Sequence, residues 1–119
     1  MLNLCRGDSP KWIPAFANVN DGAVVVTSID RYQPNAWGLR NMHGNAAEWT
    51  LSTYQSYPYV ADGRDNGQPT GRKVARGGSF YDRPQRATSS YRLSYPVWQR
   101  VFNVGFRVVC PAEPQMAAK

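Results

Sequence analysis

Apolar residues in this chain fall into short runs separated by turn-forming residues, without the regular spacing of a long helix. The clearest run is Ala23 to Ile29, AVVVTSI, whose β-branched residues predict a short strand. A second strand is predicted from Lys73 to Phe80, where two adjacent glycines indicate a close backbone approach. The last strand is predicted from Val101 to Cys110, with a break at Gly105.

The segments between these runs are dominated by turn signals and by mixed polar and aromatic residues. Ala61 to Arg72, ADGRDNGQPTGR, contains Asp-Gly, Asn-Gly and Pro-Thr-Gly signals for consecutive turns. Leu51 to Val60 is rich in Tyr and Ser, and Tyr81 to Arg100 mixes aromatic, Arg and Ser residues without a clean period. The residues alone therefore predict an irregular, mainly antiparallel domain of the α+β or all-β class.

Composition limits the chain to one domain of 119 residues with a small core. No apolar run is long enough to cross a membrane, and the opening MLNLCRGDSP lacks the apolar core of a signal peptide, so the compartment stays undecided. The cysteines, Cys5 and Cys110, fit no CxxC spacing, which disfavours zinc. Whether they are free or bridged is left open.

The formal net charge is +6, and many arginines lie between Arg64 and Arg107. Such a chain can bind nucleic acid or another anionic partner. No nucleic-acid motif accompanies the charge, and Arg in an irregular domain often ties loops to carbonyls and carboxylates. We therefore do not expect nucleic acid as the partner. The lone histidine, His43, has no nucleophile motif near it and is read as a hydrogen-bonding or solvated residue.

The densest cluster of turn-forming residues is Pro34 to Thr50, PNAWGLRNMHGNAAEWT. Its proline and glycines fix a tight backbone path. Asn41, Asn45 and Glu48 bring side-chain oxygens close together on that path, which suits a hard cation such as calcium. A hydrogen-bonded turn without metal explains the same residues equally well.

This stretch resembles the PNxxGLYDMxGNVWEWT signature of formylglycine-generating enzymes, the sulfatase-modifying-factor family. Val74 to Phe80, VARGGSF, is similar to the family's RVxRGGSW, and Gly105 to Val108, GFRV, is similar to its closing GFRxV. The resemblance covers the C-terminal half of the usual family domain, and the helical N-terminal half has no counterpart here. It implies a protein that needs a missing-half partner or pairs with a second copy of itself.

The fold that the resemblance implies is α+β, an irregular C-type-lectin-like fold with short antiparallel strands and little helix. The domain organisation that follows is an N-terminal extension at 1–14, a formylglycine-generating-enzyme-like domain at 15–110 and a flexible tail at 111–119. The resemblance also implies calcium. One ion is expected among four residues of the signature, namely Asn41, Gly44, Ala46 and Glu48. A second, weaker candidate site lies in the shortened segment from Phe16 to Gly22, with Asn18, Val19 and Asp21 as its candidate ligands.

The family's copper chemistry is not expected in this chain. Its two copper(I)-binding cysteines lie just after the RGGS motif, where Asp82 and a position near Ala87 stand here. A tryptophan that flanks the family's substrate groove is Ala47. We therefore expect no copper and no formylglycine generation. The alternative is one part of an oxidase whose missing half supplies the chemistry.

What remains is a surface rich in Tyr, Arg and Trp, residue types that are enriched in binding hot spots. The candidate ligand-binding residues are Ser79, Tyr81, Asp82, Arg83, Arg86, Tyr91, Tyr95, Trp98 and Asn103. Tyr81, Arg83 and Trp98 are the better surface candidates, whereas Arg92 and Arg107 are expected to be structural. The main hypothesis is a non-catalytic, calcium-stabilised domain that binds a protein or small-molecule ligand through residues 81–102. The same stretch aligns with the segment varied in diversity-generating retroelement proteins, which gives a further alternative.

Overall fold

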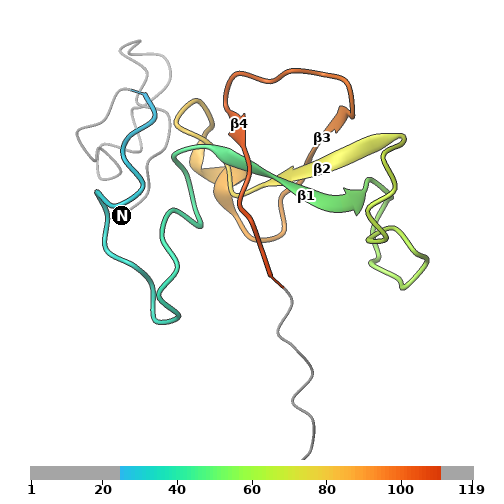
Figure 1. The fold of residues 1–119 in the computed structure, drawn as a ribbon, viewed down its shortest axis with the longest axis horizontal. Helices are drawn as coiled ribbons and strands as arrows, with labels where there is room; N and C mark the ends of the chain where they lie inside the picture. Colours follow the sequence, from blue (N-terminus) through green and yellow to red (C-terminus); the bar gives the residue numbers. More distant parts are fainter. Residues whose placement is uncertain (1–24, 111–119) are drawn as a thin grey trace, which may run out of the picture.

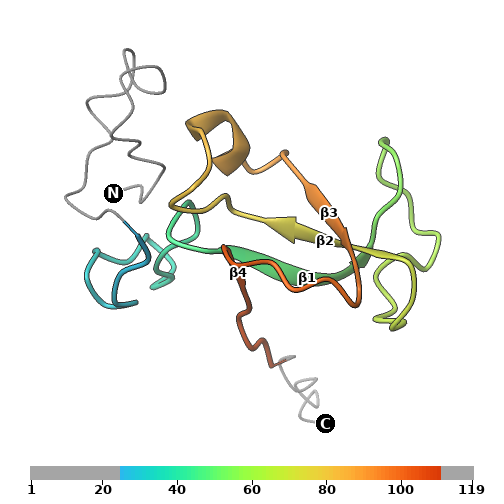
Figure 2. The ribbon, with the colours of Figure 1, turned by 90° about the horizontal axis from the view of Figure 1, so that it is seen from above.

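The computed structural model describes residues 25–110 of the chain. Its elements are β1 (Ala47–Thr53), β2 (Arg72–Arg76), the 3-10 helix η2 (Pro84–Ala87), β3 (Leu93–Pro96) and β4 (Val104–Gly105). The strands form one sheet in the order β3-β2-β1-β4 (Figure 1). Seen from above, η2 lies in the connection that leaves the end of β2 and returns to β3 (Figure 2). None of the helices in the described part of the chain is long and apolar enough to cross a membrane.

The pairing of β1 shows that the sheet is mixed rather than purely antiparallel. β1 runs antiparallel to β2, and β2 runs antiparallel to β3, as expected. β4 instead runs parallel to β1, with Ala47 beside Val104 and Glu48 beside Gly105. The register of β1 against β2 shifts between Trp49 and Thr53. These short, irregular ladders leave most connections as loops.

The part of the core where β1 and β2 pair is built from small side chains. Ala47, Val74 and Ala75 are fully buried, and Ala87 of η2 packs nearby with 4% exposure. Small core residues let backbone segments approach closely, and the glycine pair after β2 continues this arrangement. A Cβ added at Gly78 would lie only 2.9 Å from the Cα of Ala87. The close backbone approach expected from the paired glycines is therefore confirmed.

The strand expected at Ala23 to Ile29 is wrong for its described part. Residues 25–29 join no strand, and the side chains of Val25, Val26 and Ile29 are more than half exposed. Asn45 substitutes for a neighbouring strand: its Oδ1 accepts from the Thr27 backbone N–H at 2.9 Å, and its Nδ2 donates to the Thr27 carbonyl. A β-branched run forms a ladder only where another strand offers an edge, and here a single amide side chain holds the backbone.

The two later strands are shorter than the sequence predicts. The strand expected at Lys73 to Phe80 ends at Arg76, since both following glycines have positive φ and turn the chain. The strand expected at Val101 to Cys110 is paired only over β4. Residues 106–110 then leave the sheet (Figure 1). Phe106, Val108 and Val109 are each more than three-quarters exposed along this departing segment.

Candidate functional site

Three buried polar side chains meet just beyond the end of β2. Ser79, Asp82 and Asn103 are 0%, 2% and 6% exposed, and we call them the Ser79 hub. The Ser79 hydroxyl donates to Oδ2 of Asp82 at 2.5 Å and accepts from Nδ2 of Asn103 at 2.7 Å. It also accepts from the Tyr81 backbone N–H at 3.2 Å. One donor and two acceptor positions are all that a hydroxyl offers, so this hydroxyl is fully satisfied inside the protein.

The buried carboxylate of the hub is balanced by an arginine from η2. Nη1 of Arg86 donates to Oδ1 of Asp82 at 3.1 Å, and the Arg86 side chain remains about half exposed. The pKa of the Arg86 guanidinium is raised above its ordinary value, chiefly by this hydrogen bond. The pKa of the Tyr95 phenol is also raised, first by burial and then by the Asp82 charge. A buried charge that is paired and hydrogen-bonded can be kept in place, whereas an unpaired one cannot.

Backbone hydrogen bonds tie the hub to the Pro34–Thr50 stretch. The Phe80 N–H donates to the Asn45 carbonyl at 2.9 Å, and the Ala47 N–H donates to the Asn103 carbonyl at 3.0 Å. His43 Nδ1 lies 2.5 Å from the Ala87 carbonyl and so fixes the end of η2. The residues around Ser79 and Asn103 are therefore both held by the Pro34–Thr50 stretch, although they are 24 positions apart in the sequence.

An aromatic cluster stands on the solvent side of this region. Phe80, Tyr81 and Phe102, which we call the aromatic trio, contact one another edge to face. Ring centroids of Tyr81 and Phe102 are 5.2 Å apart with planes at 77°. Tyr81 is 62% exposed and Phe102 is 74% exposed. Large apolar rings that remain this exposed are informative, because a folded chain usually buries such groups.

The other candidate ligand-binding residues divide between surface and interior. Trp98 is 79% exposed, and Arg83 is exposed at the residue before η2. Tyr91 and Tyr95 are half-buried, and Tyr95 packs edge to face on Trp49 at 5.8 Å. Within residues 25–110, no ring contact joins Trp98 to the aromatic trio. The structure thus brings together only part of the predicted surface.

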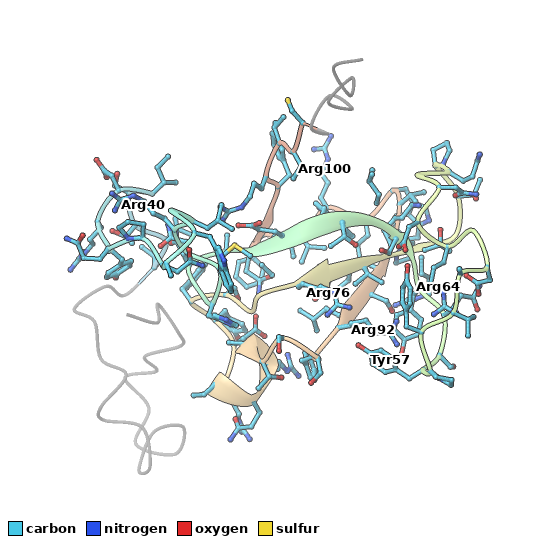
Figure 3. All side chains as sticks on the ribbon, turned by 90° about the horizontal axis from the view of Figure 1, so that it is seen from below. Arg40, Tyr57, Arg64, Arg76, Arg92 and Arg100 are labelled. Carbon is cyan, nitrogen blue, oxygen red and sulfur yellow. The ribbon has the colours of Figure 1, made fainter. Side chains whose placement is uncertain are left out.

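Arg92 is held by two tyrosines from a distant loop. Its guanidinium carbon lies 3.7 Å from the ring centroid of Tyr57 and 4.9 Å from that of Tyr54. The Tyr57 hydroxyl donates to the Ser90 carbonyl at 2.9 Å. Tyr57 and Arg92 lie against each other in Figure 3, whereas Arg100 lies apart from them. Arg92 therefore joins the 54–57 loop to the segment before β3 through cation–π contacts.

Phe80 and Phe102 are members of the cluster that the sequence did not single out. A signal for Phe102 was available in the last predicted strand. Alternation puts Val101 and Asn103 on one side and Phe102 on the other. If Asn103 faces inward to a polar partner, Phe102 must face solvent, and this is what the structure shows.

The predicted calcium residues lie around an ion pair. Glu48 accepts from Nε and Nη2 of Arg107 at 2.9 and 2.7 Å, and Nη2 also donates to the Arg40 carbonyl. The Asn41 amide donates to the Ile29 carbonyl at 3.2 Å. In this arrangement both Glu48 oxygens face a cation of the protein itself, so the donor set does not fit a calcium ion unless Arg107 is displaced. The hydrogen bond to Glu48 is the main cause of the raised pKa of Arg107.

Two adjoining cavities of about 730 and 410 Å³ flank this ion pair. Both are lined by residues of the predicted calcium loop and by the chain after β4, among them Asn41, Ala46, Glu48, Phe106 and Arg107. Gly44 is buried, and its N–H donates to the Gly77 carbonyl. The Ala46 side chain lies against Gly105. The other predicted metal ligands, Asn18, Val19 and Asp21, lie outside the described residues.

The positions that the resemblance assigns to copper-binding cysteines are both buried. Asp82 belongs to the Ser79 hub, and Ala87 packs on Gly78. Cys110 is exposed, and Cys5 lies outside the described residues. Among residues 25–110 no group of three His, Cys, Asp or Glu side chains is placed to hold a metal ion.

A comparison with solved structures finds a Treponema denticola protein, "variable protein 1", with a TM-score of 0.58 and 23% sequence identity. The match covers 69% of this chain and 31% of the Treponema protein, so the chain spans about a third of that protein's length. This likeness concerns the fold, and it confirms the expected C-type-lectin-like class with little helix. No protein of the curated set matches the chain in a sequence comparison.

A comparison with protein families matches residues 6–112 to the sulfatase-modifying factor enzyme 1-like domain. The match includes all three motifs, which are the Pro34–Thr50 stretch, Val74 to Phe80 and Gly105 to Val108. Because it extends over most of the sequence, the resemblance inferred from those motifs is confirmed. The chain belongs to the sulfatase-modifying factor enzyme 1-like domain family.

Proposed function

We propose that this chain is a non-catalytic binding domain that contacts its ligand through exposed aromatic and basic side chains within residues 80–102. The observation that supports the proposal most is the aromatic trio, in which the rings of Tyr81 and Phe102 are exposed while the backbone beneath them is fixed by the Ser79 hub. Rigid placement matters because side chains held before binding lose less entropy when they contact a partner. Tyr and Trp are also residue types that dominate binding energy at interfaces.

Ser79, Asp82 and Asn103 have a different role in this proposal from the one expected from the sequence. Their side chains are buried and hydrogen-bonded to each other, so we assign them to holding the surface rather than to touching the ligand. Tyr81, Phe102 and Trp98 are the proposed contact residues. Arg83 and Arg86, both exposed, follow Tyr81 along the chain.

The test is a selection of random 12-residue peptides displayed on phage against the immobilised wild-type domain. Selected peptides are then measured against Tyr81→Ala, Phe102→Ala and, as a matched control, Tyr59→Ala, whose ring is 55% exposed in a different loop. We expect affinity to fall about tenfold or more with each face variant and to stay within about twofold with the control. Peptides that bind all four proteins equally would refute this face as the binding surface.

A second candidate is a display protein in which the exposed residues of this face are diversified between copies of the gene. The likeness in fold to the Treponema variable protein supports it, since that name describes a protein with variable sequence. The test is to sequence the encoding locus. A nearby imperfect repeat of the segment for residues 80–102, with a reverse transcriptase gene beside it, is the expected finding, and an isolated single-copy segment argues against diversification.

The proposal has no oxidation step. Neither Asp82, which is paired with Arg86, nor the methyl of Ala87 can replace the thiolates that copper(I) requires. An assay with copper, oxygen and a cysteine-containing peptide is therefore expected to give no aldehyde. Aldehyde formation that is lost in Cys110→Ser would favour the alternative in which this chain is part of an oxidase.

A further inference from the structure

We propose that the partner at the aromatic trio is an acidic polypeptide segment, in which carboxylates meet Arg83 and Arg100 while an apolar side chain packs on the rings of Tyr81 and Phe102. This rests on the proposed function, since it names the ligand class of the same face. The first observation is the charge of the surrounding sequence. Residues 79–104 contain four arginines and a single acidic residue, Asp82.

The one acidic residue does not present its charge to solvent. Asp82 is 2% exposed, and its two oxygens accept from Ser79 and Arg86. Arg83 and Arg100 are exposed. Arg83 lies two residues after Tyr81 in the sequence, and Arg100 lies two residues before Phe102. Within residues 25–110 Arg100 forms no ion pair. Arg100, near Phe102 in the chain, thus offers positive charge that carboxylates of a partner can approach, and Arg83 adds positive charge near Tyr81.

The geometry of the rings separates an acidic polypeptide from a nucleic acid. Single-stranded nucleic acid is bound by stacking successive bases on aromatic faces. In the aromatic trio neighbouring rings stand at 70–77° to one another, so they do not form a series of parallel platforms. Carboxylate oxygens are attracted to the partial positive charge of ring edges and to arginines, whereas bases stack on ring faces.

The probes are three fluorescein-labelled peptides of 12 residues that alternate Phe with Glu, with Gln or with Lys, together with a fluorescein-labelled 12-nucleotide oligothymidine. Fluorescence anisotropy gives the dissociation constant of each at low salt and at about 1 M salt, where the screening length falls to about 3 Å. We expect the Glu peptide to bind at least about tenfold more tightly than the Gln peptide at low salt, and this difference to shrink at high salt.

Variants assign the charge effect to this face. Arg100→Ala is expected to weaken the Glu peptide about threefold or more and to leave the Gln peptide unchanged. The matched control is Arg72→Ala, which removes the same charge from the start of β2, whereas Tyr81 follows the other end of that strand. Equal losses in the two arginine variants would show a general charge effect and overturn the inference.

The remaining outcomes distinguish this inference from the proposed function. Equal, Tyr81-dependent binding of the Glu and Gln peptides would keep the binding face and overturn the acidic partner. Tighter binding of oligothymidine than of the Glu peptide would also overturn it and favour nucleic acid. If Tyr81→Ala has the melting temperature of the wild type and binds the Glu peptide with the same affinity, the face around Tyr81 and Phe102 is refuted as the binding surface.

Discussion

The Ser79 hub and the aromatic trio lie side by side along the chain, and their burial is the reverse of what their chemistry favours. Hub residues are polar and buried, whereas Tyr81 and Phe102 are aromatic and exposed. The hub compensates by satisfying its hydrogen bonds internally, and its charge is paired with Arg86. Among residues 25–110, the ring contacts of the trio are its own edge-to-face pairs. Burial of polar groups fixes the backbone, and exposed rings are left for a partner.

If this division is correct, substitutions should separate sharply by region. Changes at the hub should reduce stability because they leave buried polar groups unpaired. Changes at the close contact between Gly78 and Ala87 should reduce it because they force atoms together. Changes at exposed rings should reduce binding and leave stability nearly unchanged. The predictions below test that separation by thermal melting or urea denaturation, from the largest expected effect on stability to the smallest.

The largest loss is expected for Gly78→Ala. Gly78 has φ of +67°, and an added Cβ would lie 2.9 Å from the Cα and 3.1 Å from the N of Ala87, which are backbone atoms. Backbone strain and overpacking together should cost about 3 kcal/mol or more in the free energy of unfolding. Gly38→Ala is the control, since it has φ of +76° but nothing within 4 Å. Equal melting temperatures for the two variants would contradict the proposed contact.

The next largest effect is expected for Ser79→Ala. This change removes the hydroxyl that joins Asp82, Asn103 and the Tyr81 N–H, and leaves buried groups without that partner. We expect a loss of about 2–3 kcal/mol in the free energy of unfolding, measured by urea denaturation. Ser90→Ala, at an exposed position, should change stability by less than about 0.5 kcal/mol. A small effect at Ser79 would mean that the hub does not fix the face.

A smaller, metal-dependent effect is expected at Arg107. Arg107→Gln removes the partly exposed pair with Glu48, which should cost about 1 kcal/mol in EGTA. It also leaves the Glu48 carboxylate available to calcium, so millimolar calcium should raise the melting temperature of this variant more than that of the wild type. In the double variant Arg107→Gln with Glu48→Gln, calcium should no longer raise the melting temperature more than it does in the wild type. No calcium response in Arg107→Gln would rule out calcium at Glu48, which until then stays a prediction from the sequence.

The smallest effect on stability is expected for Trp98→Ser. The Trp98 side chain is 79% exposed and makes no ring contact with the described residues of the trio. We expect the free energy of unfolding to change by less than about 0.5 kcal/mol. Trp49→Ser is the contrasting variant, because Trp49 packs on Tyr95 and should destabilise clearly. A large loss at Trp98 would place it in the fold rather than on the binding surface.

The amino-acid sequence by itself determined the family, the fold class and the close approach at the glycine pair. Those features depend on local requirements: turn residues at fixed spacing and two glycines where no Cβ fits. It also placed the irregular Tyr- and Arg-rich stretch at residues 81–102. Outside the last predicted strand, where alternation with Asn103 marks Phe102, it did not separate the members of that stretch, because without a clean period no pattern says which side chains face inward.

Only the tertiary structure decided those directions. Ser79 and Asn103, which are 24 residues apart, meet because the Asn45 and Ala47 backbone holds both segments. Phe102, next to Asn103, faces outward against Tyr81. The Asn45 side chain holds the Thr27 backbone, and residues 25–29 join no strand. The ion pair of Glu48 with Arg107 arises in the same way, across 59 residues. Long-range pairing of this kind depends on which segments the sheet brings together, and no local spacing in the sequence records it.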